Sequence, residues 1–259
     1  MNSQFDKKRY KALDILRGFT LISMILYHGM WDLIYMAGFS VPWYGETPGY
    51  LWQQSICLTF ILLSGFCQPL GRKKIRRALT VSGAGLLVTA VTLLFMPQNR
   101  VVFGVLTLIG SCMLFWALLE KRLSKVPALW GLAGSLFLFI FTRDTARGCL
   151  GFFGLQLLAL PEELYANLFT AWLGFPFHGF FSTDYFPVLP WLFLYSAGAY
   201  LHRLMRESKC CASIWSWLET PGLIMHIPLL SWIGRNSLVI YLLHQPLLYG
   251  MLMIWQAVT

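Results

Sequence analysis

The stretch LDILRGFTLISMILYHGMWDL, Leu13–Leu33, decides the fold class, because most of it is as apolar as a membrane-spanning helix. It also carries four ionisable side chains, those of Asp14, Arg17, His28 and Asp32. At about 100° per residue, the four fall within about 60° of arc and form one polar stripe on the helix. A charge that faces lipid costs about 3 kcal/mol or more, so we expect the stripe to face the interior of a helix bundle.

The composition of the whole chain agrees with a membrane location. Of its 259 residues, 57% are hydrophobic and only 12% are charged, which is about half the charged fraction of a typical soluble domain. This length suits one compact bundle, so we expect residues 1–259 to form a single membrane-embedded domain. The net charge is +9, and in a membrane protein such an excess of Lys and Arg lies mainly in the cytoplasmic loops. Nucleic-acid binding is the weaker interpretation, because the basic residues lie between apolar segments.

Seven apolar segments are long enough to cross a bilayer, which needs about 20 residues. They are Ile15–Gly38, Leu51–Leu70, Ala78–Met96, Val101–Leu119, Val126–Thr142, Phe186–His202 and Leu229–Trp255. The sequence therefore predicts an all-α, polytopic transmembrane bundle of about seven spans. Two shorter apolar pieces lie between residues 143 and 185, and we expect them to be interfacial or re-entrant helices on the outer side. An eighth and a ninth short span are the alternative for these pieces.

The basic clusters between the spans predict the orientation. The clusters DKKRYK, RKKIRR, EKRLSK and HRLMRESK all fall on one side of a seven-span chain, whereas the opposite loops hold only three arginines. Because basic loops stay in the cytoplasm, we expect an integral membrane protein with a cytoplasmic N-terminus and an outer C-terminus. A bacterial cytoplasmic membrane is the expected location.

The last span carries a second set of polar residues. Counted from Leu230, His244 lies about 21 Å into a continuous helix, and this matches the depth of His28 in the first span. Tyr241 shares the face of His244, while Arg235 and Asn236 lie nearer the cytoplasmic end.

Two histidines at one depth, with the carboxylate of Asp32 one turn from His28, suit general acid–base chemistry. Structural alternatives remain open for each residue. Asp14 and Arg17 would also suit an ion pair at a helix end, and His28 an interhelical hydrogen bond. Asp32 would also suit a position near the outer surface, and Arg235 an interfacial anchor. A metal site made of two histidines and an aspartate is the less favoured alternative.

Several motifs resemble known membrane enzymes. RGFTLISMILYH places Arg17 and His28 with ten residues between them, which is similar to the Arg/Lys-x10-His motif in the first helix of the acyltransferase type 3 proteins. From about residue 10 to residue 252, the chain resembles the short bacterial members of the heparan-α-glucosaminide N-acetyltransferase catalytic-domain family. The matching pieces are ALDILRG, YHGMWDL, FILLSGF, VVFGVLTLIG, STDYFPVLPWLFLYSAGAYL and IGRNSLVIYLLHQPLL.

The resemblance implies a membrane acyltransferase, in which Arg17 and His28 match the helix-one motif and His244 matches the final His-Gln-Pro. Three departures limit how far the family can be followed. The lysosomal branch has Asn at the position of His28 and its catalytic histidine in the following loop, where this chain has none. Thr107 stands where bacterial relatives commonly have histidine, and the larger relatives have more spans.

The resemblance implies that the protein takes an acyl group from cytoplasmic acyl-CoA, and we expect this group to be acetyl. The acceptor would be an amine or hydroxyl of a glycan or of a lipid-linked envelope molecule. In this hypothesis His28 is the general base oriented by Asp32, and His244 or Tyr241 stabilises the oxyanion. Residues expected at the CoA site are Arg17, Asp14, Arg235 and Asn236. Residues expected to contact the acceptor are Asp184, Tyr185 and Trp191, and no metal is expected.

Two functions of other classes stay open from the sequence. A proton-coupled transporter or flippase would also use intramembrane His and Asp, and a non-catalytic membrane subunit is favoured by Thr107. The acyl chain, the acceptor, homo-oligomer formation and the choice between direct transfer and an acyl-histidine intermediate are likewise left open.

Overall fold

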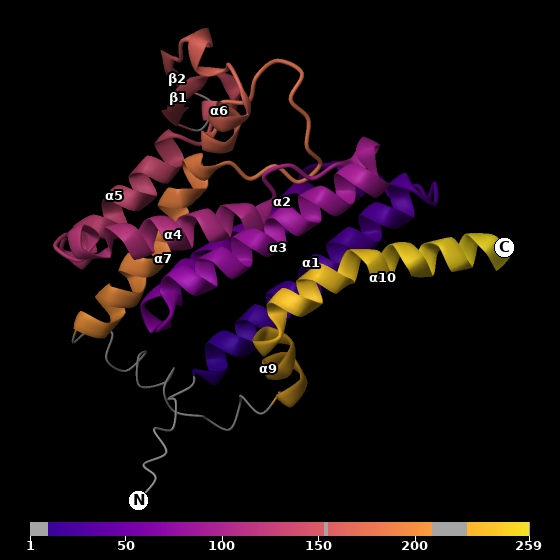
Figure 1. Cartoon of the computed structure of the whole chain (residues 1–259), viewed down its shortest axis with the longest axis horizontal. Helices are drawn as coiled ribbons and strands as arrows, with labels where there is room; N and C mark the ends of the chain where they lie inside the picture. Colours follow the sequence, from indigo (N-terminus) through magenta and orange to yellow (C-terminus); the bar gives the residue numbers. More distant parts are fainter. Residues whose placement is uncertain (1–9, 153–154, 209–226, 259) are drawn as a thin grey trace, which may run out of the picture. The chain divides into compact units, whose positions relative to one another are not determined.

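The computed structural model describes residues 10–152, 155–208 and 227–258, and most of this length is helical (Figure 1). The chain divides into two compact units. The first consists of Met1–Phe60 and Met205–Thr259, and the second is Ile61–Leu204. The prediction of a single domain stays a prediction, and each unit is described by itself.

The first unit is built on the helix that contains the opening stretch. Its helices are α1 Lys11–Tyr35, the 3-10 helix η1 Pro42–Gly45, the first part of α2 Thr47–Phe66, α9 Pro228–Arg235 and α10 Ser237–Val258. Helix α10 packs along α1 (Figure 1). Leu21 and Met24 of α1 and Ile56 of α2 form a buried cluster, which joins these helices through apolar contacts.

The two sides of α1 differ as the polar stripe predicts. Asp14 and Asp32 are buried, with 8% and 3% of their surface exposed. The opposite side carries exposed apolar side chains, among them Leu16, Phe19 and Leu26. The helix therefore directs its stripe into the protein and its apolar face outward, as a lipid-facing helix does.

The backbones of α1 and α9 approach each other at two glycines. A Cβ atom on Gly18 would overlap the carbonyl of Leu230, and a Cβ atom on Gly234 would overlap the carbonyl of Asp14. The helices can be this close only because neither glycine carries a side chain, which is the small-residue packing common between membrane helices.

The last predicted span is not one continuous helix. The helix is interrupted at Asn236, between the end of α9 and the start of α10. The Asn236 side chain donates a hydrogen bond of 2.9 Å to the Trp232 carbonyl. Counting residues from Leu230 along a straight helix was therefore wrong. Asn side chains compete for backbone hydrogen bonds, and this favours helix ends over helix interiors.

The second unit continues from α2 through most of α7. Its elements are the end of α2, η2 Gln68–Leu70, α3 Lys74–Phe95, η3 Pro97–Asn99, α4 Val105–Leu123, α5 Ala128–Phe141, η4 Thr145–Arg147, β1 Cys149–Phe152, β2 Leu155–Ala159, η5 Glu162–Leu164, α6 Leu168–Leu173 and α7 Val188–Glu207. Helices α3 and α4 pack side by side (Figure 1). A Cβ on Gly85 would meet Thr107, and one on Gly110 would meet Ser82, so glycines again permit close packing.

The prediction of helices between residues 143 and 185 was only partly right. Within the piece CLGFFGLQLLAL, Cys149–Phe152 and Leu155–Ala159 form an antiparallel pair of strands, β1 and β2, instead of a helix. Phe152 packs its ring against Phe137 and Phe141 of α5, while Leu155, Leu157 and the rest of β2 are exposed. The following piece contains a six-residue helix, α6, whose N-terminus is capped by Asn167. Gly151, where a Cβ would overlap Leu155, favours the strand pairing.

Among the described residues, three helical segments are long and apolar enough to cross a membrane: Thr47–Leu70, Lys74–Phe95 and Ser237–Val258. Each of the other predicted spans also contains a helix, but α5 has only 14 residues and α1 carries several charged groups. The protein is thus an integral membrane protein, and the number of seven spans stays a prediction.

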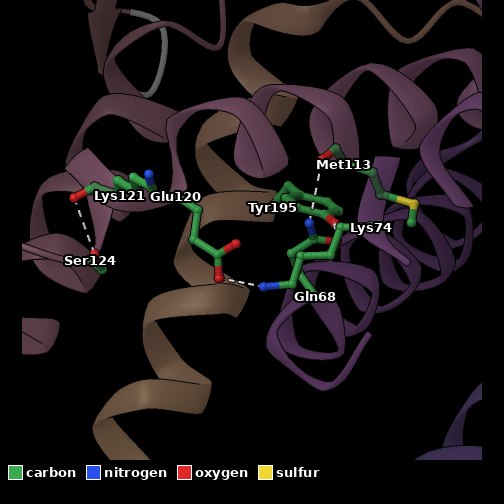
Figure 2. Close-up of polar contacts among 7 residues, drawn as sticks. All are labelled: Gln68, Lys74, Met113, Glu120, Lys121, Ser124 and Tyr195. Atoms are coloured by element: carbon green, nitrogen blue, oxygen red, sulfur yellow. Dashed lines mark hydrogen bonds and ion pairs between the residues drawn. The ribbon is translucent and has the colours of Figure 1, made fainter. Parts of the chain in front are cut away.

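A buried hydrogen-bond network joins α7 to η2 and α4 (Figure 2). The Tyr195 hydroxyl donates to Gln68 Oε1 at 2.9 Å, and Gln68 Nε2 donates to the Met113 carbonyl at 3.4 Å. Lys74 and Glu120 form an ion pair nearby between α3 and α4. The network satisfies a buried amide that would otherwise lack partners.

We predict that Tyr195→Phe lowers the free energy of unfolding by about 1–3 kcal/mol, because it leaves Gln68 Oε1 buried without a donor. Removing the second partner as well, in Tyr195→Phe/Gln68→Leu, should restore part of this loss. Urea unfolding in detergent micelles measures both. Equal stability of Tyr195→Phe and the wild type would contradict the importance of the network.

Candidate functional site

Two histidine rings from different helices lie together in the first unit. The ring centroids of His28 on α1 and His244 on α10 are 5.1 Å apart. The ring of Tyr241 is 5.3 Å from that of His244, and the ring of Tyr27 is 6.1 Å from that of His28. His28 and His244, which the sequence predicts at the same depth in the membrane, thus lie side by side. They do so although α10 begins at Ser237 and not at Leu230, from which the depth was counted.

Asp32 is held by α10 rather than by its own helix. Its Oδ1 accepts a hydrogen bond of 2.9 Å from Nε2 of Gln245. We expected Asp32 to orient His28 from the next helical turn, but the carboxylate points across to the neighbouring helix instead. The Asp32–Gln245 bond therefore links α1 to α10 beside the histidine pair.

The tautomer of His244 follows from its backbone contact. His244 Nδ1 lies within hydrogen-bond distance of the Tyr241 carbonyl oxygen. A carbonyl oxygen only accepts, so Nδ1 must carry the proton, and a neutral ring then keeps a lone pair on Nε2. Pro246 follows two residues later and lacks a backbone N–H, so it leaves the carbonyl one turn before it without its helical donor.

Three buried polar atoms at this site have no hydrogen-bond partner within the described part of the chain. They are Asp32 Oδ2, His244 Nε2 and Gln245 Oε1. Buried polar atoms are nearly always paired, so three of them on adjoining side chains indicate a place where a polar ligand or water is bound. All three can accept hydrogen bonds when Asp32 is ionised and His244 is neutral.

Aromatic side chains border the histidines on the side of η1. Tyr44 donates a hydrogen bond of 3.0 Å to the Tyr27 carbonyl, and the rings of these two residues are 4.9 Å apart. Trp52 of α2 packs edge-on against Tyr27 and donates a hydrogen bond of 2.8 Å to Ser23. These contacts attach the loop after α1 to the helix and support the backbone around His28.

The residues expected at the CoA site lie at the other end of α1 and on α9. Arg17 and Asp14 form an ion pair with an N···O distance of 3.6 Å, which agrees with the helix-end alternative. Arg235 is exposed, and the side chain of Asn236 is hydrogen-bonded to the Trp232 carbonyl at the break between α9 and α10. Arg17 lies about 16 Å along α1 from His28.

The three expected acceptor residues lie in the second unit and make structural contacts there. Asp184 Oδ2 accepts a hydrogen bond of 3.3 Å from the backbone N–H of Val105, at the start of α4. Tyr185 donates to the Ala171 carbonyl, and Trp191 packs against Phe139. Asp184 thus acts as a carboxylate at a helix N-terminus, where negative charge is favoured.

Burial raises the pKa of Asp184 from 3.8 to about 6, and the hydrogen bond from Val105 opposes this rise. A raised native pKa means that the carboxyl group adds stability below about pH 4 and loses that contribution as the pH rises through about 6. We predict that the stability of the wild type relative to Asp184→Asn falls by roughly 3 kcal/mol between these limits. Thermal unfolding across this pH range measures it, with the exposed Glu163→Gln as control. Parallel pH curves for the wild type and Asp184→Asn would contradict it.

Gln245 is the site residue that sequence reasoning did not single out. It follows His244 directly in the sequence. A glutamine in an apolar helix does not by itself indicate a site, and only its hydrogen bond to Asp32 of α1 reveals one. Among the described residues, no group of three or more His, Cys, Asp or Glu side chains lies together as a metal site requires. Thr107 packs against Gly85 in the second unit, and its carbonyl accepts a hydrogen bond of 2.8 Å from Ser111.

Comparison with known proteins agrees with the motifs. The sequence profile described as heparan-alpha-glucosaminide N-acetyltransferase, catalytic, matches residues 9–246, which contain α1, both histidines, Asp32 and Gln245. Searches of curated proteins and of solved structures gave no significant match. The profile covers most of the chain and confirms the resemblance found from the motifs, so this protein belongs to the heparan-α-glucosaminide N-acetyltransferase catalytic-domain family.

Proposed function

We propose that the protein is a membrane acetyltransferase, which takes an acetyl group from cytoplasmic acetyl-CoA and transfers it to an amine or hydroxyl of a glycan or envelope molecule. Membership of the family supports an acetyltransferase-type membrane enzyme. The donor side, the acceptor and the residue roles below are our proposal.

The donor would bind along α1. Arg17 lies at the N-terminal end of α1, and the distribution of the basic clusters predicts that this end faces the cytoplasm. A guanidinium group binds phosphate through two parallel hydrogen bonds. Its separation from His28 of about 16 Å suits an extended pantetheine arm, with the phosphates at one end of the helix and the thioester at the other. Asp14 would hold the Arg17 side chain in place through their ion pair.

The chemical step would use the two histidines. His244 Nε2 has the lone pair of a general base, so it would take the proton from the acceptor as the acceptor nitrogen or oxygen attacks the thioester carbon. The carbon–sulfur bond then breaks, and the CoA thiolate takes the proton back from His244. His28, whose ring lies beside that of His244, would donate a hydrogen bond to the oxyanion formed in between.

The observation that carries this proposal is the pairing of His28 with His244 next to buried, unpartnered acceptor atoms. The test reconstitutes the protein in liposomes with radiolabelled acetyl-CoA and a methyl glucosaminide as probe acceptor. We expect labelled product, and we expect Arg17→Gln to raise the KM for acetyl-CoA about tenfold or more by removing a charged hydrogen-bond donor.

The matched control is Arg147→Gln, which removes an exposed arginine from the second unit. No transfer to the probe or to an envelope extract, with proton-coupled flux instead, would favour the transporter. An unchanged KM in Arg17→Gln would contradict the role proposed for α1 in binding the donor.

A further inference from the structure

The hydrogen bond between Asp32 and Gln245 determines which way each side chain points. An ionised carboxylate has only lone pairs, so the Gln245 amide must turn Nε2 toward Asp32 Oδ1. The amide oxygen, Oε1, then points away from the carboxylate. Both Oε1 and the second carboxylate oxygen, Oδ2, are buried without a partner in the described chain.

Together with His244 Nε2, these two oxygens are three acceptor atoms without a partner in the described chain. Residues 244 and 245 are adjacent on α10, the hydrogen bond joins Asp32 of α1 to Gln245, and the ring of His244 lies beside that of His28. A group that satisfies such a set must bring several N–H or O–H donors, because an acceptor cannot pair with another acceptor. A group with a single donor would leave two of the atoms buried and unpaired.

We propose that Gln245 is a positioning residue, which holds Asp32 so that Asp32, His244 and Gln245 together present three acceptor atoms to a donor-rich group of the acceptor substrate. This rests on the proposed function. The donor nitrogen of Gln245 acts through Asp32, and its loss leaves Asp32 free to turn toward His28 or toward water. A displacement of about 1 Å in a positioning group costs roughly 100-fold in rate.

The test compares two replacements of Gln245 in the liposome assay. Gln245→Met keeps the length of the side chain but removes both the donor nitrogen and the acceptor oxygen of the amide, and we expect it to lower kcat/KM for the methyl glucosaminide about 10- to 100-fold while the KM for acetyl-CoA stays unchanged. Gln256→Met is the matched control, because Gln256 also lies on α10 and donates to a carbonyl, that of Met36, outside the site.

Gln245→Glu separates positioning from a merely structural role. The introduced carboxyl group donates to Asp32 only when it is protonated, so its activity relative to the wild type should recover as the pH falls. Tyr44 of η1 interacts electrostatically with Asp32, and the titratable His28 and His244 lie on the two helices that carry Asp32 and Gln245. Dividing by the wild-type rate at each pH corrects for the titration that both proteins share. Activity of Gln245→Met equal to that of Gln256→Met, or no recovery of Gln245→Glu at low pH, would overturn the inference.

Failure of the proposed function is distinguishable from failure of this inference. If the wild type transfers no acetyl group, the proposed function fails, and probe binding then decides about Gln245. In that case methyl glucosaminide should raise the Tm of the wild type and of Gln256→Met but not that of Gln245→Met. Equal shifts in the three proteins, or no shift in the wild type, would overturn the inference.

Discussion

Replacing His244 by alanine is expected to lower acetyl transfer about 100- to 10,000-fold, which is the range for loss of a general base. The reason is the tautomer. Nδ1 of His244 is engaged with the Tyr241 carbonyl, so Nε2 is the buried nitrogen that can take a proton from the acceptor. The rate of label transfer under saturating acetyl-CoA measures the effect, and the KM for acetyl-CoA should change little.

The matched control is His178→Ala, because His178 is exposed in the second unit. His28→Ala should also lower the rate, since its ring lies against that of His244, but added imidazole should rescue His244→Ala more completely. Full activity of His244→Ala would exclude the proposed base, and loss only in His28→Ala would return that role to His28.

Replacing Gly234 by leucine is expected to separate α9 from α1 and to lower the free energy of unfolding by roughly 3 kcal/mol, at the upper end for overpacking. A Cβ at this position would overlap the backbone of Asp14, and backbone cannot rotate away as a side chain can. Because α10 follows α9 after a single residue, Asn236, the change should also move His244 away from His28. Thermal unfolding in detergent and the transfer rate measure the two effects.

Gly250→Leu is the control for this experiment, since Gly250 lies on α10 with open space where its Cβ would be. It adds the same side chain to the same half of the protein, and we expect a change in Tm close to zero or slightly positive. Similar destabilisation by Gly250→Leu and Gly234→Leu would show that the contact between α1 and α9 has no special importance.

The polar stripe of α1 could be predicted because it depends only on helical periodicity and the cost of charge in lipid. Asp14, Asp32 and the exposed apolar face lie as that argument requires. The hairpin of β1 and β2 could not be predicted in the same way. Its short apolar run has no periodicity that separates strand from helix, and Gly151 is informative only once the Leu155 carbonyl lies against it.

The sequence by itself determined that this is a helical membrane protein of a recognisable family, since composition, span length and motifs are local properties of the chain. Only the tertiary structure decided that Asp32 pairs with Gln245, because the two residues are 213 positions apart and meet through the packing of α1 against α10. It likewise decided that Asp184 caps α4. Such pairings depend on how the helices are rotated against each other, which no local pattern in the sequence encodes. The break at Asn236 is local by contrast, because the Asn236 side chain donates to the Trp232 carbonyl one helical turn earlier.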